Sequence, residues 1–330
     1  MKLNLMHEIA VAPVVPSDAE SVNGSPARVS PPLPSDRNQP FTGNSIAPDE
    51  ALWSIDWGPC IVLGLLLVVL YHRIAIKLVT DWATLPDFSH GFLIPFFALF
   101  LLWDKRRGLR NTPIVPTWSG IWLVALGLFA LLLGVLGADL FIQRTSFVLL
   151  TAGLVWTLLG KAMLGRLKFV LFVLLLAIPL PTILFNQITF PLQLLASHFA
   201  AGILPLFQVP VLQEGNIIQL PAMPLEVAEA CSGIRSLMSL FTVAVMYGYL
   251  FERATWRRVV LALSSVPIAV TANVARIVGT GLCVQYWDPD KALGFFHEFS
   301  GWLMFIVSLA CLYLVDLAMR VLAPERRRTA

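Results

Sequence analysis

Three residues of the types that catalyse acyl transfer lie in the C-terminal third of the chain. Cys231 is part of "LEVAEACSGIRSL", Arg276 of "ANVARIVG" and His297 of "FFHEFSGW". A thiolate attacks a carbonyl carbon, a histidine carries the proton, and an arginine stabilises the negative charge that develops on the oxygen. We therefore interpret Cys231, Arg276 and His297 as a candidate cysteine acyl-transfer site.

The residues around Cys231 favour a reactive thiol. The cysteine stands where an apolar, predicted helical segment begins, and the positive end of a helix dipole favours a thiolate. Arg235 follows four residues later on the same helix face, and Ser232 and Gly233 leave the approach to the sulfur uncrowded. The alternative is a thiol packed as a small hydrophobe, which is the usual state of a cysteine in an apolar segment.

Arg276 is a charge within an otherwise apolar stretch. Placing a charged side chain in a bilayer costs at least about 2.5 kcal/mol, so such a residue usually has a function. Asn273 precedes it by one turn on the same face, where it can orient the guanidinium or bind a substrate backbone. Snorkelling to the interface, or pairing with an acid such as Glu229, is the alternative for Arg276.

Three more residues are expected to support the site. Glu226 and Glu229 are expected to orient His297 or to pair with one of the two arginines, Arg235 and Arg276. His90, in "FSHGFLIP", is expected to have a supporting or substrate-binding role.

The composition indicates a membrane protein. Hydrophobic residues make up 57% of the chain and charged residues 13%, against about 25% charged residues in soluble domains. A span needs roughly 20 mainly apolar residues. Eight segments meet this description, and the predicted fold class is an all-α polytopic bundle of about eight transmembrane helices. The predicted spans are 59–80, 88–103, 119–138, 141–160, 168–186, 232–251, 258–284 and 299–322.

The basic residues predict the orientation of these spans. Cations concentrate in alternate loops and at the C-terminal end, and the positive-inside rule makes that side cytoplasmic. Both termini are then cytoplasmic, and Cys231, Arg276 and His297 meet at the extracytoplasmic face. The cations that carry this assignment are Lys105, Arg106, Arg107, Arg110, Lys161, Arg166, Lys168, Arg253, Arg257, Arg258, Arg320 and Arg326 to Arg328.

The chain divides into a tail, a membrane domain and a short basic end. Residues 1–50 are rich in Pro and Ser and are predicted to be a disordered cytoplasmic tail. Residues 51–323 form the membrane domain, with an extracytoplasmic insertion at about 187–230 before the sixth span. An interfacial helix and a short hairpin over "VPVLQEGNIIQL" are expected there. Residues 324–330 form a basic cytoplasmic tail.

Composition and spacing suggest neither a metal nor an organic cofactor. The four cysteines, Cys60, Cys231, Cys283 and Cys311, lie far apart, and the histidines are scattered. The net charge of +3 is too small to indicate a nucleic-acid partner.

The motifs resemble the exosortase/archaeosortase family of integral-membrane cysteine transpeptidases. The resemblance rests on "EACSGIRSL", "NVARI", "HEFSGW", "FSHGFLIP" and "IPLP", in the expected order over residues 55–322. Histidine at position 297 favours the bacterial branch, because the archaeal enzymes carry arginine there. The resemblance implies a multi-pass protein of the bacterial cytoplasmic (inner) membrane with Cys231 as nucleophile, Arg276 as transition-state stabiliser and His297 as proton carrier.

The resemblance also implies a substrate class. Family members are thought to act on exported proteins with a C-terminal sorting signal of the PEP-CTERM-like kind, namely a short motif, a membrane helix and an arginine-rich end. The resemblance further implies that the cleaved protein passes to an acceptor linked to exopolysaccharide or to lipid. Two alternatives stay open: an intramembrane cysteine protease that only hydrolyses, and a transporter with Arg276 and Asn273 along its path.

Overall fold

The computed structural model describes residues 57–227, 233–287 and 295–323, with side chains from residue 58 and, in the last segment, from residue 299. All of these residues belong to one compact unit, Ile46–Ala330. The predicted tails, residues 1–50 and 324–330, lie outside the described residues.

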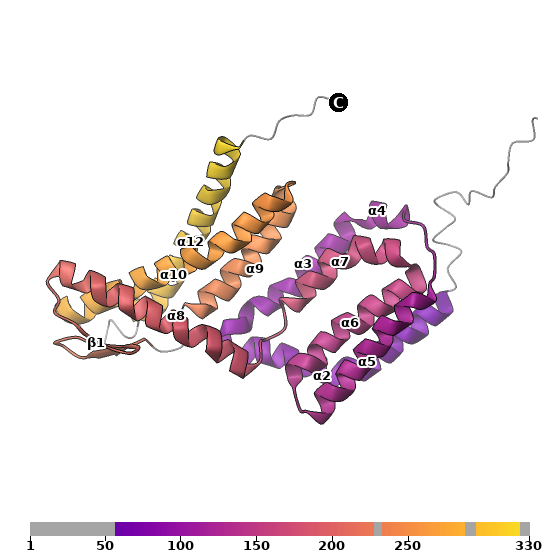
Figure 1. Ribbon diagram of the computed structural model, residues 1–330, viewed down its shortest axis with the longest axis horizontal. Helices are drawn as coiled ribbons and strands as arrows, with labels where there is room; N and C mark the ends of the chain where they lie inside the picture. Colours follow the sequence, from indigo (N-terminus) through magenta and orange to yellow (C-terminus); the bar gives the residue numbers. More distant parts are fainter. Residues whose placement is uncertain (1–56, 228–232, 288–294, 324–330) are drawn as a thin grey trace, which may run out of the picture. The chain divides into compact units, whose positions relative to one another are not determined.

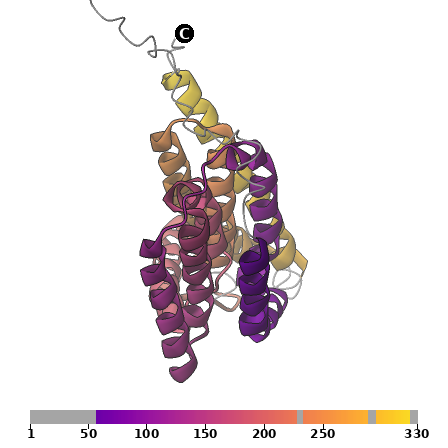
Figure 2. The same ribbon diagram turned by 90° about the vertical axis from the view of Figure 1, so that its right-hand side faces the viewer.

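The described chain is almost entirely helical (Figures 1 and 2). Three short strands interrupt it: β1 (Leu212–Glu214), β2 (Ile217–Gln219) and β3 (Pro224–Glu226). The helices are α2 (Trp57–Thr84), η1 (Pro86–Phe92), α3 (Leu93–Asp104), α4 (Arg106–Arg110), η2 (Trp118–Gly120), α5 (Ile121–Leu136), α6 (Leu140–Leu159), α7 (Lys161–Leu175), α8 (Thr182–Ile203), η3 (Leu204–Phe207), α9 (Ile234–Phe251), α10 (Thr255–Tyr286) and α12 (Phe295–Leu322).

Eight helical segments of the described chain are long and apolar enough to cross a membrane. Their outward faces are apolar. On α2, for example, the side chains of Leu65, Leu66 and Val68 are each more than 60% exposed. Such a surface is unfavourable in water and suited to lipid. The predicted all-α polytopic membrane bundle is therefore confirmed.

The predicted span over 168–186 is wrong in its bounds. In the structure α7 ends at Leu175 and α8 begins at Thr182. The linker contains "IPLP", residues 178–181. Proline lacks a backbone N–H and disfavours helical geometry in the residue before it, so Pro179 and Pro181 end one helix before the next begins.

The first turn of α8 lies beside the turn between α5 and α6. Thr182 and Asn186 of α8 line the same cavity as Ala138 and Asp139 of that turn. Asp87 of η1 lines it too. The start of α8, η1 and the α5–α6 turn therefore lie on one side of the bundle.

The far end of α8 reaches the C-terminal end of α10. The Tyr286 hydroxyl donates a hydrogen bond to the Phe207 carbonyl (2.7 Å), and Leu204 packs closely against Gly281. The C-terminal half of α10 lies on the same side of the bundle as η1, because Asn273 in that half and Asp87 of η1 both contact the first turn of α9. Both ends of α8 therefore lie on one side, and Figure 1 shows α8 running crosswise to α9 and α10. Although α8 is long and apolar enough to cross a membrane, it runs along this side of the bundle.

The three strands form a small antiparallel sheet in the order β1-β2-β3. Glu214 pairs with Ile217, so Gly215 and Asn216 form a two-residue turn, and Gly215 takes the left-handed φ of +63° that this turn requires. Ile218 is fully buried and belongs to a core cluster shared with Val274 and Ile277 of α10. Ile218 pairs with Leu225 of β3, which belongs to the same cluster, so this packing also fixes the strand that leads toward the start of α9. The extracytoplasmic location of the sheet stays a prediction.

Helices α9, α10 and α12 pack against one another as a group. Leu240 of α9, Leu261 of α10 and Leu312 of α12 are all at most 3% exposed and share one core cluster. At the ends of these helices, Glu252 bonds to Arg257 (3.1 Å) and to Arg320 (2.9 Å). The three helices are thus tied together by buried charges at one end and by apolar packing along their length.

Candidate active site at the ends of α9, α10 and α12

One face of α10 carries the two predicted polar residues toward the neighbouring helices. Small or apolar side chains recur every four residues on this face, from Leu261 through Ser265 to Ala269, and all three are at most 1% exposed. Asn273 continues the row and is 4% exposed. Arg276 follows three residues later on the same face. Close packing of this row places Asn273 and Arg276 at the contacts with α9 and α12.

Asn273 lies against the first turn of α9. Gly233 caps α9 with a φ of +74°, a conformation that favours glycine. A Cβ atom added to Gly233 would lie 2.9 Å from Cβ and from Cγ of Asn273. Glycine is therefore required at position 233 both by the backbone and by the approach of Asn273.

Arg276 lies against the first turns of α12. Its Nε donates a hydrogen bond to the Ser300 hydroxyl (3.3 Å). A Cβ atom added to Gly301 would lie 3.3 Å from Nη2 of Arg276, so the missing side chain leaves room for the guanidinium. The predicted arginine is thus held against the helix that contains His297.

Arg235, in the first turn of α9, forms an ion pair with Asp87 of η1 (Nε to Oδ1, 3.1 Å). Sequence analysis expected Glu226 or Glu229 as its partner. Asp87 lies three residues before His90 in the same short helix, so the pair connects the "FSHGF" segment to the start of α9.

The "FSHGF" segment is held by close packing. The indole of Trp82 lies so near Gly91 that an added Cβ would be 2.3 Å from its Nε1 atom, and that nitrogen donates a hydrogen bond to the Ala177 carbonyl (2.8 Å). Within the described residues, the buried Nδ1 atom of His90 has no hydrogen-bond partner. The supporting role of His90 stays a prediction.

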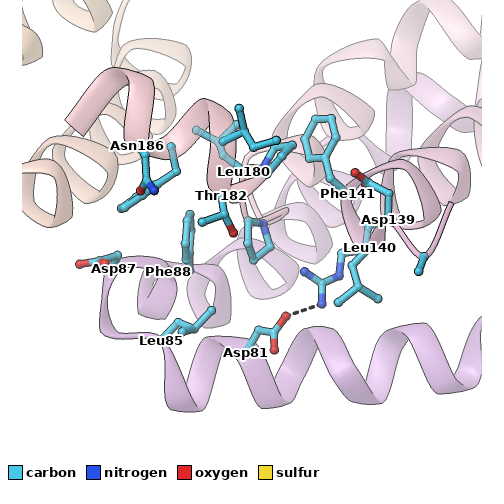
Figure 3. A pocket seen from close by; sticks show the side chains of 16 residues that line it. Asp81, Leu85, Asp87, Phe88, Asp139, Leu140, Phe141, Leu180, Thr182 and Asn186 are labelled. Atoms are coloured by element: carbon cyan, nitrogen blue, oxygen red, sulfur yellow. Dashed lines mark hydrogen bonds and ion pairs between the residues drawn. The ribbon is translucent and has the colours of Figure 1, made fainter. Parts of the chain in front are cut away.

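A cavity of about 560 Å³ lies beside Asp87 (Figure 3). Its walls come from α2, η1, the α5–α6 turn, the α7–α8 linker and the start of α8. In Figure 3, Asp87 and Asn186 lie on one side of it and Asp139 on the other. At its base, the Arg144 guanidinium donates to the carboxylate of Asp81. The volume and the mixed lining suit a small ligand or a short peptide segment.

The buried ion pair at the base of the cavity is supported by a third charge. Arg144 is 4% exposed and Asp81 6%. Lys77 also contacts Asp81, at 2.9 Å. Buried charges of this kind require partners, and the group joins α2 to α6.

The predicted site residues fall into three groups. Asn273 and Arg276 are brought to the starts of α9 and α12, and Arg235 lies in the first turn of α9. Glu226 is exposed at the end of β3, the edge strand. Cys231 and Glu229 lie outside the described residues, and His297 lies in the first turn of α12 with a side chain outside them.

Sequence analysis missed Asp87, Ser300 and the Asp81–Arg144 pair. The first two stand three residues from predicted histidines, Asp87 before His90 and Ser300 after His297. That spacing on a helix was the available signal. In the described ranges, no group of three or more His, Cys, Asp or Glu side chains is arranged to hold a metal ion.

The fold and the site define a class of protein: a polytopic helical membrane protein with polar side chains gathered at one end of three packed helices. The model of the transmembrane exosortase family matches residues 82–314, and the chain belongs to this family. No curated protein and no solved structure matches the chain. Family membership supports a membrane transpeptidase or protease as the class of activity and exported proteins with sorting signals as the substrates.

Proposed function

We propose that this protein is a cysteine transpeptidase that cuts the C-terminal sorting tail from exported proteins and transfers them to an extracytoplasmic acceptor. The observation that carries the proposal is that Asn273 and Arg276 of one helix contact the beginnings of two others, at Gly233 and at Ser300. Of these two helices, α9 follows the predicted nucleophile, Cys231, in the chain, and α12 contains the predicted proton carrier, His297.

Chain geometry limits how far the remaining residues lie from this contact. Cys231 precedes Gly233 by two residues, so their Cα atoms are at most about 7 Å apart. His297 precedes Ser300 by three residues on α12, and residues at that spacing share a helix face. The proposal therefore puts both positions within reach of a substrate held at Arg276.

The proposed reaction has two balanced steps. The Cys231 thiolate attacks the scissile carbonyl, Arg276 stabilises the oxyanion, and the C–N bond breaks as His297 protonates the leaving amine. The products are a thioester and the released tail. In the second step His297 takes a proton from an acceptor amine as the amine attacks the thioester, and the C–S bond breaks to restore the thiolate and the protonated histidine. Water in place of the amine gives hydrolysis, the alternative activity.

We further propose that the cavity beside Asp87 receives the substrate segment next to the scissile bond. The Asp87–Arg235 pair supports this, because it joins the cavity wall to the first turn of α9. Carboxylate, amide and hydroxyl groups of Asp139, Asn186 and Thr182 offer hydrogen bonds to a peptide.

The test compares three strains that carry the wild-type protein, Cys231→Ser or Cys283→Ser. Cys283 is a half-buried thiol on α10 and serves as the matched control. Intact-protein mass spectrometry determines whether exported proteins that end in a membrane helix and an arginine cluster keep that tail. We expect tails to be lost in the wild type and the control, and kept with Cys231→Ser.

The mass of the new C-terminus then separates the two enzymatic alternatives. A free carboxylate indicates hydrolysis, and an added group indicates transfer. If tails are cut equally in all three strains, Cys231 is not the nucleophile for them and the proposal fails, which favours the transporter alternative.

A further inference from the structure

Two cations and two stacked aromatic rings meet at the end of the bundle away from the candidate active site. Tyr249 of α9 stacks on Phe169 of α7, with ring centroids 3.6 Å apart and ring planes within 6° of parallel. Nζ of Lys105 and Cζ of Arg258 each lie 4.9 Å from the centroid of the Tyr249 ring. Phe169 covers one face of that ring, which leaves the other face and the rim to the two cations.

The positive charge of this group is not balanced by the described residues. Lys105 donates to the backbone carbonyl of Arg166 (3.2 Å), and Nε of Arg258 donates to the backbone carbonyl of Glu252 (2.7 Å). In the described part of the chain neither cation forms an ion pair with a carboxylate, and the Glu252 carboxylate is bonded to other arginines. Two like charges around one ring repel each other, and a bound anion would remove that repulsion.

The group lies where lipid headgroups would surround the protein. One candidate span ends at Asp104, directly before Lys105. Another, α9, ends two residues after Tyr249, and the span of α10 begins three residues before Arg258. Residues at the ends of three spans lie at the boundary between hydrocarbon and water, where phospholipid phosphates are found.

We propose that Lys105, Arg258 and the ring of Tyr249 bind the phosphate of an acidic phospholipid. Arg258 uses only Nε for the backbone carbonyl, so its two terminal nitrogens can bind two phosphate oxygens in the bidentate geometry that arginine favours. The Lys105 ammonium adds a second positive contact. Each cation is held by a backbone carbonyl and by the ring, so the site is formed before the lipid arrives.

The test measures lipid retention by the full-length protein in nanodiscs of phosphatidylcholine with phosphatidylglycerol as a minor component. Native mass spectrometry counts the phosphatidylglycerol molecules that stay bound as their share in the disc is varied. The double variant Lys105→Gln/Arg258→Gln is expected to bind phosphatidylglycerol roughly thirtyfold more weakly. The matched control, Arg107→Gln/Arg110→Gln, removes the same charge from exposed positions and is expected to change binding little.

A second pair of variants keeps the proposal testable if the double variant does not fold. Tyr249→Phe keeps a ring for the cations and is expected to bind like the wild type, whereas Tyr249→Leu is expected to bind more weakly. Equal losses in the two charge-removing variants would mean that total charge, and not this site, attracts the lipid. Displacement of phosphatidylglycerol by inorganic phosphate at matched concentration would identify a site for free phosphate. Either result overturns the proposal.

Discussion

Nε of Arg276 donates a hydrogen bond to the hydroxyl oxygen of Ser300, 3.3 Å away, across the interface between α10 and α12. The next residue is Gly301, where an added Cβ would lie 3.3 Å from the same guanidinium. The arginine thus occupies space that a side chain on α12 would otherwise fill, and its position depends on a glycine.

We expect Gly301→Val to displace the guanidinium and to slow tail removal by about a hundredfold, the effect of a misplacement of about 1 Å in an active site. The rate of tail loss in a pulse-chase experiment measures it. The control is Gly279→Val on α10, where an added Cβ meets no atom within 4 Å. Equal rates for the two variants would show that the position of Arg276 does not matter.

Gly233→Ala tests the contact between α9 and Asn273. The variant suffers left-handed backbone strain of about 1–2 kcal/mol and a clash with Asn273. Gly215→Ala carries similar strain at φ +63° with open space around the new Cβ. We therefore expect both variants to lose some thermal stability in detergent, and Gly233→Ala alone to lose tail cleavage. Full cleavage by Gly233→Ala would remove this contact from the site.

The Asp87–Arg235 pair is expected to make only a small contribution to stability and a measurable one to activity. The Arg235 side chain is 48% exposed and that of Asp87 19%, so solvent screens the pair and its contribution to folding is at most about 1 kcal/mol. A double-mutant cycle with Asp87→Asn and Arg235→Gln, read out as cleavage rate, should give a coupling of up to about fivefold. Independent effects of the two substitutions would contradict a link between η1 and α9.

Filling the cavity beside Asp87 is expected to weaken substrate binding. Asn186→Trp places an indole at its wall, and we expect cleavage to slow at low substrate expression and to recover at high expression. Leu206→Trp, at an exposed position of η3, is the matched control. Slow cleavage that high expression does not correct would point to a folding defect or to a role in the chemical step.

The position of α8 along one side of the bundle predicts labelling on one side of the membrane. In a background without other cysteines, Thr182→Cys and Gln208→Cys flank α8 and η3. Both are expected to react with a membrane-impermeant maleimide in intact cells, whereas Arg107→Cys is expected to react only after lysis. Opposite labelling of the first two sites would show that α8 crosses the membrane.

The site was predictable from the sequence as far as each part lies within one helix. The arginine and asparagine at positions 276 and 273 share a face of α10 whatever surrounds them, and the charge in an apolar stretch marked that face. The pairing of Asp87 with Arg235 was not predictable, because 148 residues separate the two and their contact depends on how η1 packs against α9.

The sequence predicted the all-α fold class but not the ends of every helix. The lengths of the apolar segments predicted a bundle of membrane helices. The segment 168–186, however, contains the end of α7 and the start of α8. A sum of hydrophobicity over a window is little changed by Pro179 and Pro181, but these two prolines end one helix before the next begins. The ion pair of Asp81 with Arg144 was missed for a related reason, because the acid lies just beyond the predicted end of the first span and its partner belongs to another helix.

The buried carboxylate of Glu252, at the end of α9, bonds to Arg257 of α10 and to the half-exposed Arg320 of α12, at the end opposite the site. Parting α12 from the other two helices there would break the bond of the buried Glu252 carboxylate with Arg320, whose side chain is 46% exposed. At the other end, Arg276 of α10 bonds to Ser300 of α12. Charged side chains therefore link the three helices at the end opposite the site. If a substrate helix enters between them from the bilayer, we expect the helices to separate at the end where Arg276 lies.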